Sequence, residues 1–169
     1  MINYVKGNLL DSPAVALVNT VNTVGVMGKG IALQFRWAYP HNFAVYKNAC
    51  CLGQVEIGKI LAVKDRDLIL GDKLIINLPT KTHWRLPSQY GYVEKGLTAL
   101  RAYLMENDIK SLAMPAPGCG NGGLDWNLVK SILEKYLSGL DCAVDVFEPD
   151  YNIARRGIAI VMLKTNSSY

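Results

Sequence analysis

Residues 18–30 read Val-Asn-Thr-Val-Asn-Thr-Val-Gly-Val-Met-Gly-Lys-Gly, and this run sets the fold class of the chain. An apolar strand pattern leads into two asparagines, Asn19 and Asn22. Three glycines come after them, and a helical pattern begins at Ile31. Glycines at such a turn let backbone N–H groups approach a ligand closely, and the helix N-terminus adds free donors and partial positive charge. The run predicts a binding site for a phosphate-bearing ligand, and a structural glycine turn is the alternative.

A second glycine-rich loop, residues 115–123, reads Pro-Ala-Pro-Gly-Cys-Gly-Asn-Gly-Gly. It follows another buried strand pattern, and Asp125 is suited to cap the helix after it. Strands and helices alternate along the chain, which predicts a three-layer α/β/α domain. Because both loops follow strands, they would meet at one edge of the sheet, where two facing cradles suit a diphosphate.

Hydrophobic periodicity predicts the remaining elements. We expect residues 1–149 to form one domain and residues 150–169 to be a C-terminal extension of it, as one added strand or helix. The predicted helices cover residues 31–39, 41–51, 88–107 (with Ser88 as N-cap) and 125–137, and the predicted strands cover residues 2–6, 14–19, 58–63, 68–70, 73–78, 111–114 and 142–147.

Composition limits the function classes. The 169 residues carry a formal charge of +4, which is compatible with a nucleotide or nucleic-acid partner. Four cysteines without paired spacing and two histidines predict neither a bound metal nor disulfides. The first residues lack the apolar core of a signal peptide, and no run is long enough to span a membrane. We therefore expect a cytoplasmic monomer that needs no cofactor.

Two nucleotide-binding motifs match incompletely. Gly118, Gly120 and Gly123 fit the spacing of the dinucleotide fingerprint, with acidic residues about twenty positions on. Only one further strand pattern follows this loop, whereas a dinucleotide fold needs more strand–helix units. The first loop resembles a truncated P-loop that lacks the Ser or Thr for magnesium. Both readings are disfavoured.

Three motifs, in order, resemble the macrodomain family, which binds ADP-ribose across the edge of a mixed, mostly parallel sheet between helices. The resemblance covers about residues 1–147. It is greatest to the branch that removes ADP-ribose from DNA as the antitoxin of a toxin–antitoxin pair. The matching segments are Asn19–Asn22, Val26–Ala32 and Pro117–Trp126 for the family, and Met27–Phe35, Pro79–Arg85 and Gly122–Trp126 for the branch.

The resemblance also implies site residues. Lys81 would be catalytic, as nucleophile on the anomeric carbon or as acid to the leaving base, and Asn22 would orient the distal ribose. A solvated surface charge is the alternative role for Lys81. The other expected ligand contacts are Asn8, Leu9, Asn19, Gly28, Lys29, Gly30, Ile31, Thr80, His83, Pro117, Gly118, Cys119, Gly120, Asn121, Gly122 and Trp126.

The chain departs from the family pattern at two positions. Asn8 stands where many macrodomains have an aspartate for the adenine amino group, so that contact would lack charge assistance. Gly122 stands where a related branch, which acts on protein carboxylates, pairs an aspartate with the lysine. Asp125 is three residues away and is expected to be a helix cap. Next to Lys81, residues 83–85 could stack on a base or contact nucleic-acid phosphates, or could form a half-buried turn.

The sequence therefore predicts a hydrolase that removes mono-ADP-ribose from a modified base, with thymidine in DNA as the expected substrate. A second hypothesis is a module that reads ADP-ribose without chemistry. A third is a hydrolase of protein-linked or small-molecule ADP-ribose derivatives. The expected partners are ADP-ribose and ADP-ribosylated DNA.

Overall fold

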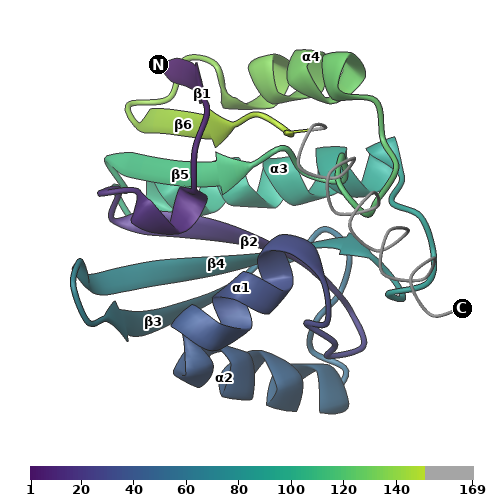
Figure 1. The fold of residues 1–169 in the computed structure, drawn as a ribbon. Helices are drawn as coiled ribbons and strands as arrows, with labels where there is room; N and C mark the ends of the chain where they lie inside the picture. Colours follow the sequence, from purple (N-terminus) through teal and green to yellow (C-terminus); the bar gives the residue numbers. More distant parts are fainter. Residues whose placement is uncertain (151–169) are drawn as a thin grey trace, which may run out of the picture.

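Six strands form one sheet in the order β1-β6-β5-β2-β4-β3 in the computed structural model, which describes residues 1–150 (Figure 1). The predicted extension beyond residue 150 lies outside the described residues. The elements are β1 (Ile2–Val5), the 3-10 helix η1 (Leu9–Asp11), β2 (Ala16–Asn22), α1 (Gly30–Ala38), α2 (Pro40–Cys51), β3 (Leu61–Asp67), β4 (Gly71–Lys81), α3 (Tyr90–Glu106), β5 (Ser111–Pro115), α4 (Trp126–Leu137) and β6 (Ala143–Phe147).

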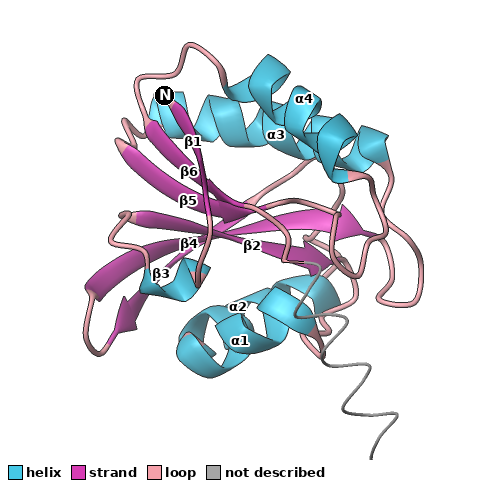
Figure 2. Cartoon of the chain, turned by 45° about the horizontal axis from the view of Figure 1, so that its top comes forward, coloured by secondary structure: helices cyan, strands magenta, loops and turns pink. Residues whose placement is uncertain are grey.

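The sheet is mixed and mostly parallel. β1, β6, β5, β2 and β4 pair in parallel, and only the edge strand β3 is antiparallel, through its hairpin with β4. Helices α3 and α4 cover one face, and α1 and α2 cover the other (Figure 2). The three-layer fold predicted from the sequence is confirmed.

Alternation along the central strands builds two cores. In β2, Ala16 and Val18 pack toward α3 and α4, whereas Leu17 packs toward α1. Both faces of this strand are buried, as expected for a parallel sheet covered on two sides. Helix α3 contributes its predicted apolar stripe to the larger core, with Val93, Leu97, Leu100 and Leu104 all buried.

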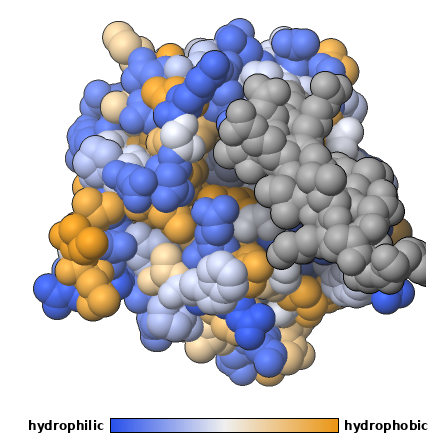
Figure 3. All heavy atoms as spheres, in the orientation of Figure 1, coloured by the Kyte–Doolittle hydropathy of each residue, from blue (hydrophilic) through white to orange (hydrophobic). Residues whose placement is uncertain are grey.

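The predicted strand over residues 68–70 is wrong. These residues form the turn of the β3–β4 hairpin, which Asp67 closes because its Oδ1 accepts hydrogen bonds from the N–H groups of Ile69 and Leu70, both at 2.7 Å. An aspartate that bonds to the backbone two and three residues ahead favours a turn over a strand. The apolar side chains of the turn are therefore exposed, and Figure 3 shows an apolar patch over this hairpin.

The predicted N-cap of α3 is also wrong. Helix α3 begins at Tyr90 after Gln89, so Ser88 lies in the preceding loop. The Ser88 hydroxyl is buried and has no hydrogen-bond partner within residues 1–150. Asp125, by contrast, caps α4 as predicted, and its carboxylate accepts from the N–H of Leu128 at 3.1 Å.

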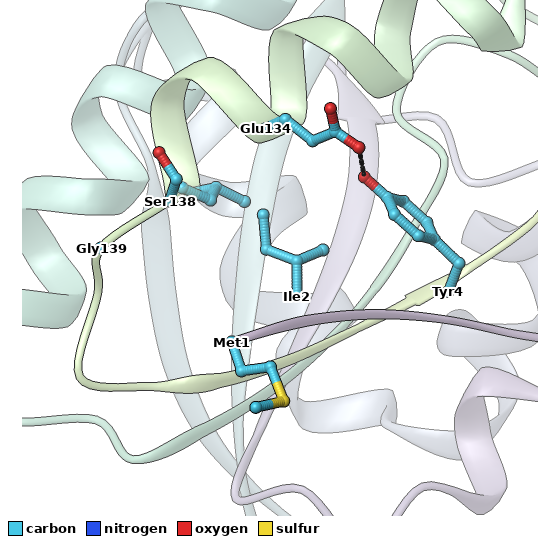
Figure 4. A pocket seen from close by; sticks show the side chains of 7 residues that line it. Met1, Ile2, Tyr4, Glu134, Ser138 and Gly139 are labelled. Atoms are coloured by element: carbon cyan, nitrogen blue, oxygen red, sulfur yellow. Dashed lines mark hydrogen bonds between the residues drawn. The ribbon is translucent and has the colours of Figure 1, made fainter.

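A small pocket of about 260 Å³ lies between the start of β1 and the end of α4 (Figure 4). Across it, the Tyr4 hydroxyl donates a hydrogen bond to Glu134 Oε1 at 3.0 Å. Burial and the neighbouring carboxylate raise the pKa of Tyr4 above its usual range, so the phenol stays neutral. The contact joins the edge strand β1 to helix α4, which covers it.

Candidate functional site

A cleft of about 1690 Å³ opens at the carboxyl ends of the parallel strands. Strands of this kind place their loops on one edge of the sheet, and that edge binds ligands in open α/β folds. Both glycine loops line the cleft, together with η1 and the loop between β4 and α3. The predicted site residues among its lining are Asn8, Leu9, Asn22, Gly28, Lys29, Gly30, Ile31, Thr80, Lys81, Gly118, Gly120, Asn121, Gly122 and Trp126.

Four predicted ligand contacts do not line the cleft: Asn19, His83, Pro117 and Cys119. Asn19 is fully buried beneath it, and its Nδ2 donates to Asn77 Oδ1 at 3.2 Å. The Cys119 side chain is buried, and burial raises the pKa of its thiol to about 12, so it is neither exposed nor a thiolate. The Asn19 side chain thus lies beneath the loop, and the Cys119 backbone N–H, which was expected to face the diphosphate, donates to the Ala116 carbonyl at 3.3 Å.

The two glycine loops touch each other and leave backbone donors free. A Cβ atom at Gly30 would lie only 3.0 Å from Asn121 Nδ2, so the loops are neighbours across the cleft. Helix α1 begins at Gly30 without a side-chain cap, which leaves its first N–H groups open to an anion. Within residues 1–150 the N–H groups of Gly120 and Gly122 also donate no hydrogen bond. The arrangement suits a diphosphate held between the loops.

Gly122 has no room for a side chain. A Cβ atom there would overlap with the hydroxyl of Ser88 and with the carbonyl oxygen of Gly118. The Ser88 N–H donates to the Gly122 carbonyl at 3.0 Å and fixes this close approach. In this chain the backbone of Gly118 and the side chain of Ser88 therefore fill the space that a side chain at position 122 would need.

Lys81, the last residue of β4, reaches across the cleft to the second glycine loop. Its Nζ donates to the carbonyl oxygen of Asn121 at 2.8 Å and lies 3.5 Å from that of Trp84. Burial lowers the pKa of the Lys81 ammonium below its usual range, and the positive charge of Lys29 lowers it further. Its position in the cleft and this lowered pKa make Lys81 a candidate for chemistry at the site.

Asn22, the last residue of β2, organises the start of the first loop. Its Oδ1 accepts from the N–H groups of Val24 and Val26 at 3.1 and 3.2 Å, and its Nδ2 donates to the Val26 carbonyl at 2.7 Å. The Tyr46 hydroxyl lies 3.0 Å from the same Oδ1. Most of the amide is thus used within the protein, and one Nδ2 hydrogen makes no hydrogen bond to residues 1–150.

Replacing Asn22 with alanine is expected to weaken ADP-ribose binding about tenfold, because it removes several loop hydrogen bonds that contribute roughly 0.5–1.5 kcal/mol each. Titration calorimetry measures the change. Asn48→Ala, at an exposed position on α2, is the matched control and should bind ADP-ribose like the unmodified chain. Unchanged affinity in Asn22→Ala would contradict the role given to this loop.

Asn8 caps η1 at the far end of the cleft. Its Oδ1 accepts from the Leu10 N–H at 3.2 Å, so the oxygen expected to bind adenine already has one partner. A second lone pair and the amide hydrogens remain, and the adenine contact stays a prediction. The sequence interpretation missed Phe147 and Ser88 in the cleft lining. The position of Phe147 at the end of β6 could have identified it, because every parallel strand ends at this edge.

Two negative findings concern residues 1–150. They hold no group of three or more histidine, cysteine, aspartate or glutamate side chains arranged to bind a metal ion. No helix in this part of the chain is both long and apolar enough to cross a bilayer.

Known proteins resemble this chain over most of its length. A DNA ADP-ribosyl glycohydrolase of Thermus aquaticus is 49% identical over 166 residues, which are 98% of this chain and 45% of the relative. The macrodomain of Mycobacterium tuberculosis DarG superposes with a TM-score of 0.85 at 48% identity, and the match covers 89% of this chain and 99% of that structure. Thermosipho africanus DarTG in complex with ADP-ribose gives a TM-score of 0.83 at 34% identity, over 88% of this chain and 41% of that one.

These matches differ in length. The chain spans less than half the length of the first curated relatives it matches, whereas it accounts for nearly all of the isolated DarG macrodomain. The family model for the Macro domain matches residues 18–133, which include both glycine loops, Lys81 and most of α4. Because the family model covers more than half of the chain and the DarG macrodomain shares its fold, the chain belongs to the macrodomain family.

Proposed function

We propose that this chain is an ADP-ribosyl glycohydrolase that removes mono-ADP-ribose from a DNA base, with thymidine as the modified nucleoside. The observation that carries the proposal is Lys81, a lysine with a lowered pKa that lines the cleft between its two glycine loops. The relatives support it, since several named DNA ADP-ribosyl glycohydrolases are 49–53% identical to this chain. The proposal includes a cytoplasmic monomer.

The cleft binds ADP-ribose in one direction. Adenine lies toward Asn8 and Leu9, the diphosphate lies between the glycine loops, and the distal ribose lies toward Asn22 and Lys81. Free backbone N–H groups and the start of α1 neutralise the phosphates without a metal ion. Binding therefore depends mainly on the backbone, and chemistry depends on a side chain.

The neutral amine of Lys81 attacks the anomeric carbon of the distal ribose. The bond from that carbon to the base breaks, and the base leaves with the electron pair and takes up the proton that the amine loses. Water then adds to the lysine-bound sugar, releasing ADP-ribose and restoring the amine. Each turnover consumes one water molecule, and the base regains its hydrogen. Cys119 is not a competing nucleophile, because burial keeps its thiol protonated.

This mechanism predicts that the rate of release rises with pH. The reactive form is the neutral amine, so activity should increase through the folded pKa of Lys81, which lies below that of a solvated lysine. Lys29→Gln removes the positive neighbour and should move the inflection to higher pH. A rate that falls as pH rises would instead indicate that Lys81 acts as an acid to the leaving base.

The substrate class is tested by comparing release from two modified macromolecules. The chain is incubated with a thymidine-ADP-ribosylated oligonucleotide and with a protein ADP-ribosylated on carboxylates, at equal concentrations. We expect faster release from DNA, because the site has no room for the aspartate at position 122 that the related protein-directed branch uses. Preferential release from protein would overturn the substrate assignment. Binding of ADP-ribose with no release from either substrate would favour a reader module.

A further inference from the structure

We propose that Trp84 and Arg85 form a platform that binds the single-stranded DNA flanking the modified base. This inference rests on the proposed function and specifies how that site recognises its substrate. The platform belongs to the loop between β4 and α3, immediately after Lys81. Both residues line the cleft, and sequence reasoning left their role open between stacking and a structural turn.

The side chains of His83, Trp84 and Arg85 stack on one another, and those of Trp84 and Arg85 are exposed. The ring of His83 stacks on the Trp84 indole with centroids 5.4 Å apart and planes inclined by 27°. The Arg85 guanidinium lies 4.5 Å from the centroid of a Trp84 ring. Trp84 nevertheless remains 42% exposed. Unlike the exposed Trp37, Trp84 lines the cleft, and together with Arg85 it places an aromatic ring and a guanidinium group beside the site.

The platform adjoins the reacting bond. Lys81 Nζ approaches the carbonyl oxygen of Trp84 at 3.5 Å, so the backbone of the loop is next to the amine that attacks the anomeric carbon. ADP-ribose fills the cleft from Asn8 toward Lys81, and the leaving group therefore lies beyond Lys81. Trp84, Arg85, Leu86 and Pro87 follow Lys81 closely in the chain and line the same cleft, so we place the leaving group against them.

The chemistry of the platform matches a nucleic-acid strand. Arg85 makes no ion pair with any residue in the described part of the chain, so its charge is available to a phosphate. Bases stack on aromatic rings and on guanidinium planes, and arginine contacts the backbone phosphates. A polypeptide carrying ADP-ribose offers neither a series of flat bases nor regularly spaced phosphates. Single-stranded DNA lets the modified base enter the cleft without the cost of unpairing it.

The test combines strand binding with turnover. Fluorescence anisotropy measures the affinity of an unmodified single-stranded oligonucleotide at several salt concentrations. Kinetic assays then give KM and kcat for an oligonucleotide with one ADP-ribosylated thymidine, for the ADP-ribosylated nucleoside alone, and for ADP-ribosylated protein. The variants are Trp84→Ala and Arg85→Ala. Their matched controls are Trp37→Ala and Arg66→Ala, which change exposed residues outside the cleft lining.

Trp84→Ala should weaken oligonucleotide binding about tenfold, the size expected for one lost base stack, and raise KM for the modified oligonucleotide to a similar extent. Arg85→Ala should flatten the dependence of log affinity on log salt by about 0.7, the value for one phosphate contact on a single strand. KM for the nucleoside should change much less in both variants, and the controls should match the unmodified chain.

Several results would overturn the platform. The platform is wrong if Trp84→Ala and Arg85→Ala both bind the oligonucleotide as tightly as the unmodified chain. It is also wrong if these variants raise KM for the nucleoside or the protein substrate as much as KM for the oligonucleotide. Failure of the proposed function gives a different result, in which the unmodified chain releases no ADP-ribose from DNA. The anisotropy measurements still decide the platform in that case, because they need no turnover.

Discussion

Lys81→Ala is expected to abolish release of ADP-ribose from DNA, with a rate loss of at least about a hundredfold, while ADP-ribose binding stays largely intact. Lys81 reaches across the cleft at the end of β4, and its lowered pKa provides the neutral amine. Binding relies on backbone N–H groups of the glycine loops, which this substitution leaves in place. Single-turnover release and titration calorimetry measure the two effects separately.

Lys81→Arg separates nucleophilic attack from charge. Arginine keeps the positive charge and hydrogen-bond donors but is always protonated and does not attack carbon. The variant should therefore be as inactive as Lys81→Ala. Lys64→Ala, at an exposed position on β3, is the control for loss of a lysine and should retain full activity. Turnover by Lys81→Ala at the rate of the unmodified chain would disprove the mechanism, and activity retained only in Lys81→Arg would reduce Lys81 to an electrostatic role.

Gly122→Glu is expected to reduce ADP-ribose affinity below detection by calorimetry. Even its Cβ atom would overlap with the Gly118 carbonyl oxygen and the Ser88 hydroxyl, so the second loop must shift. The shift turns the free N–H groups of the loop away from the diphosphate, and the carboxylate adds charge repulsion next to the phosphates. Gly122→Ala should weaken binding in the same direction, because the overlap begins at Cβ.

The matched control for these variants is Gly91→Ala, whose added methyl group meets open space at the start of α3. Thermal unfolding of all three variants distinguishes a displaced second glycine loop from an unfolded protein. Overpacking typically costs about 1–3 kcal/mol of stability, so a variant with a displaced loop should still unfold cooperatively. Normal ADP-ribose binding by a folded Gly122→Glu variant would show that the diphosphate does not lie against the second loop.

Local chemistry made much of this fold predictable. Glycines at strand-to-helix turns, the N-cap at Asp125 and the apolar stripe of α3 are signals carried by neighbouring residues, and the structure contains all of them. The prediction that the two glycine loops share one cleft followed from a rule about parallel strands. The strand predicted over residues 68–70 failed because apolar character was given more weight than the turn-forming carboxylate of Asp67.

Contacts between distant segments could not be predicted. Asn19 and Asn22 both lie on β2, but Asn19 points into a buried hydrogen-bond network with Asn77, whereas Asn22 reaches the cleft. Nothing in their local sequence separates the two. The contact of Ser88 with Gly122 likewise joins residues from different loops, and it explains why glycine is required there. The sequence alone identified Gly122 as a departure from the family pattern, but it could not predict the packing of Gly122 against Ser88 and Gly118.

Mass spectrometry of one reaction tests the central claim most directly. A single-stranded oligonucleotide with one ADP-ribosylated thymidine is incubated with the chain, and both products are weighed. The proposed glycosidic cleavage predicts an unmodified oligonucleotide together with intact ADP-ribose. An oligonucleotide that keeps a phosphoribosyl group would place the cleavage at the diphosphate. A substrate left intact would show that this chain does not remove ADP-ribose from DNA. Either result would contradict the proposed glycosidic cleavage.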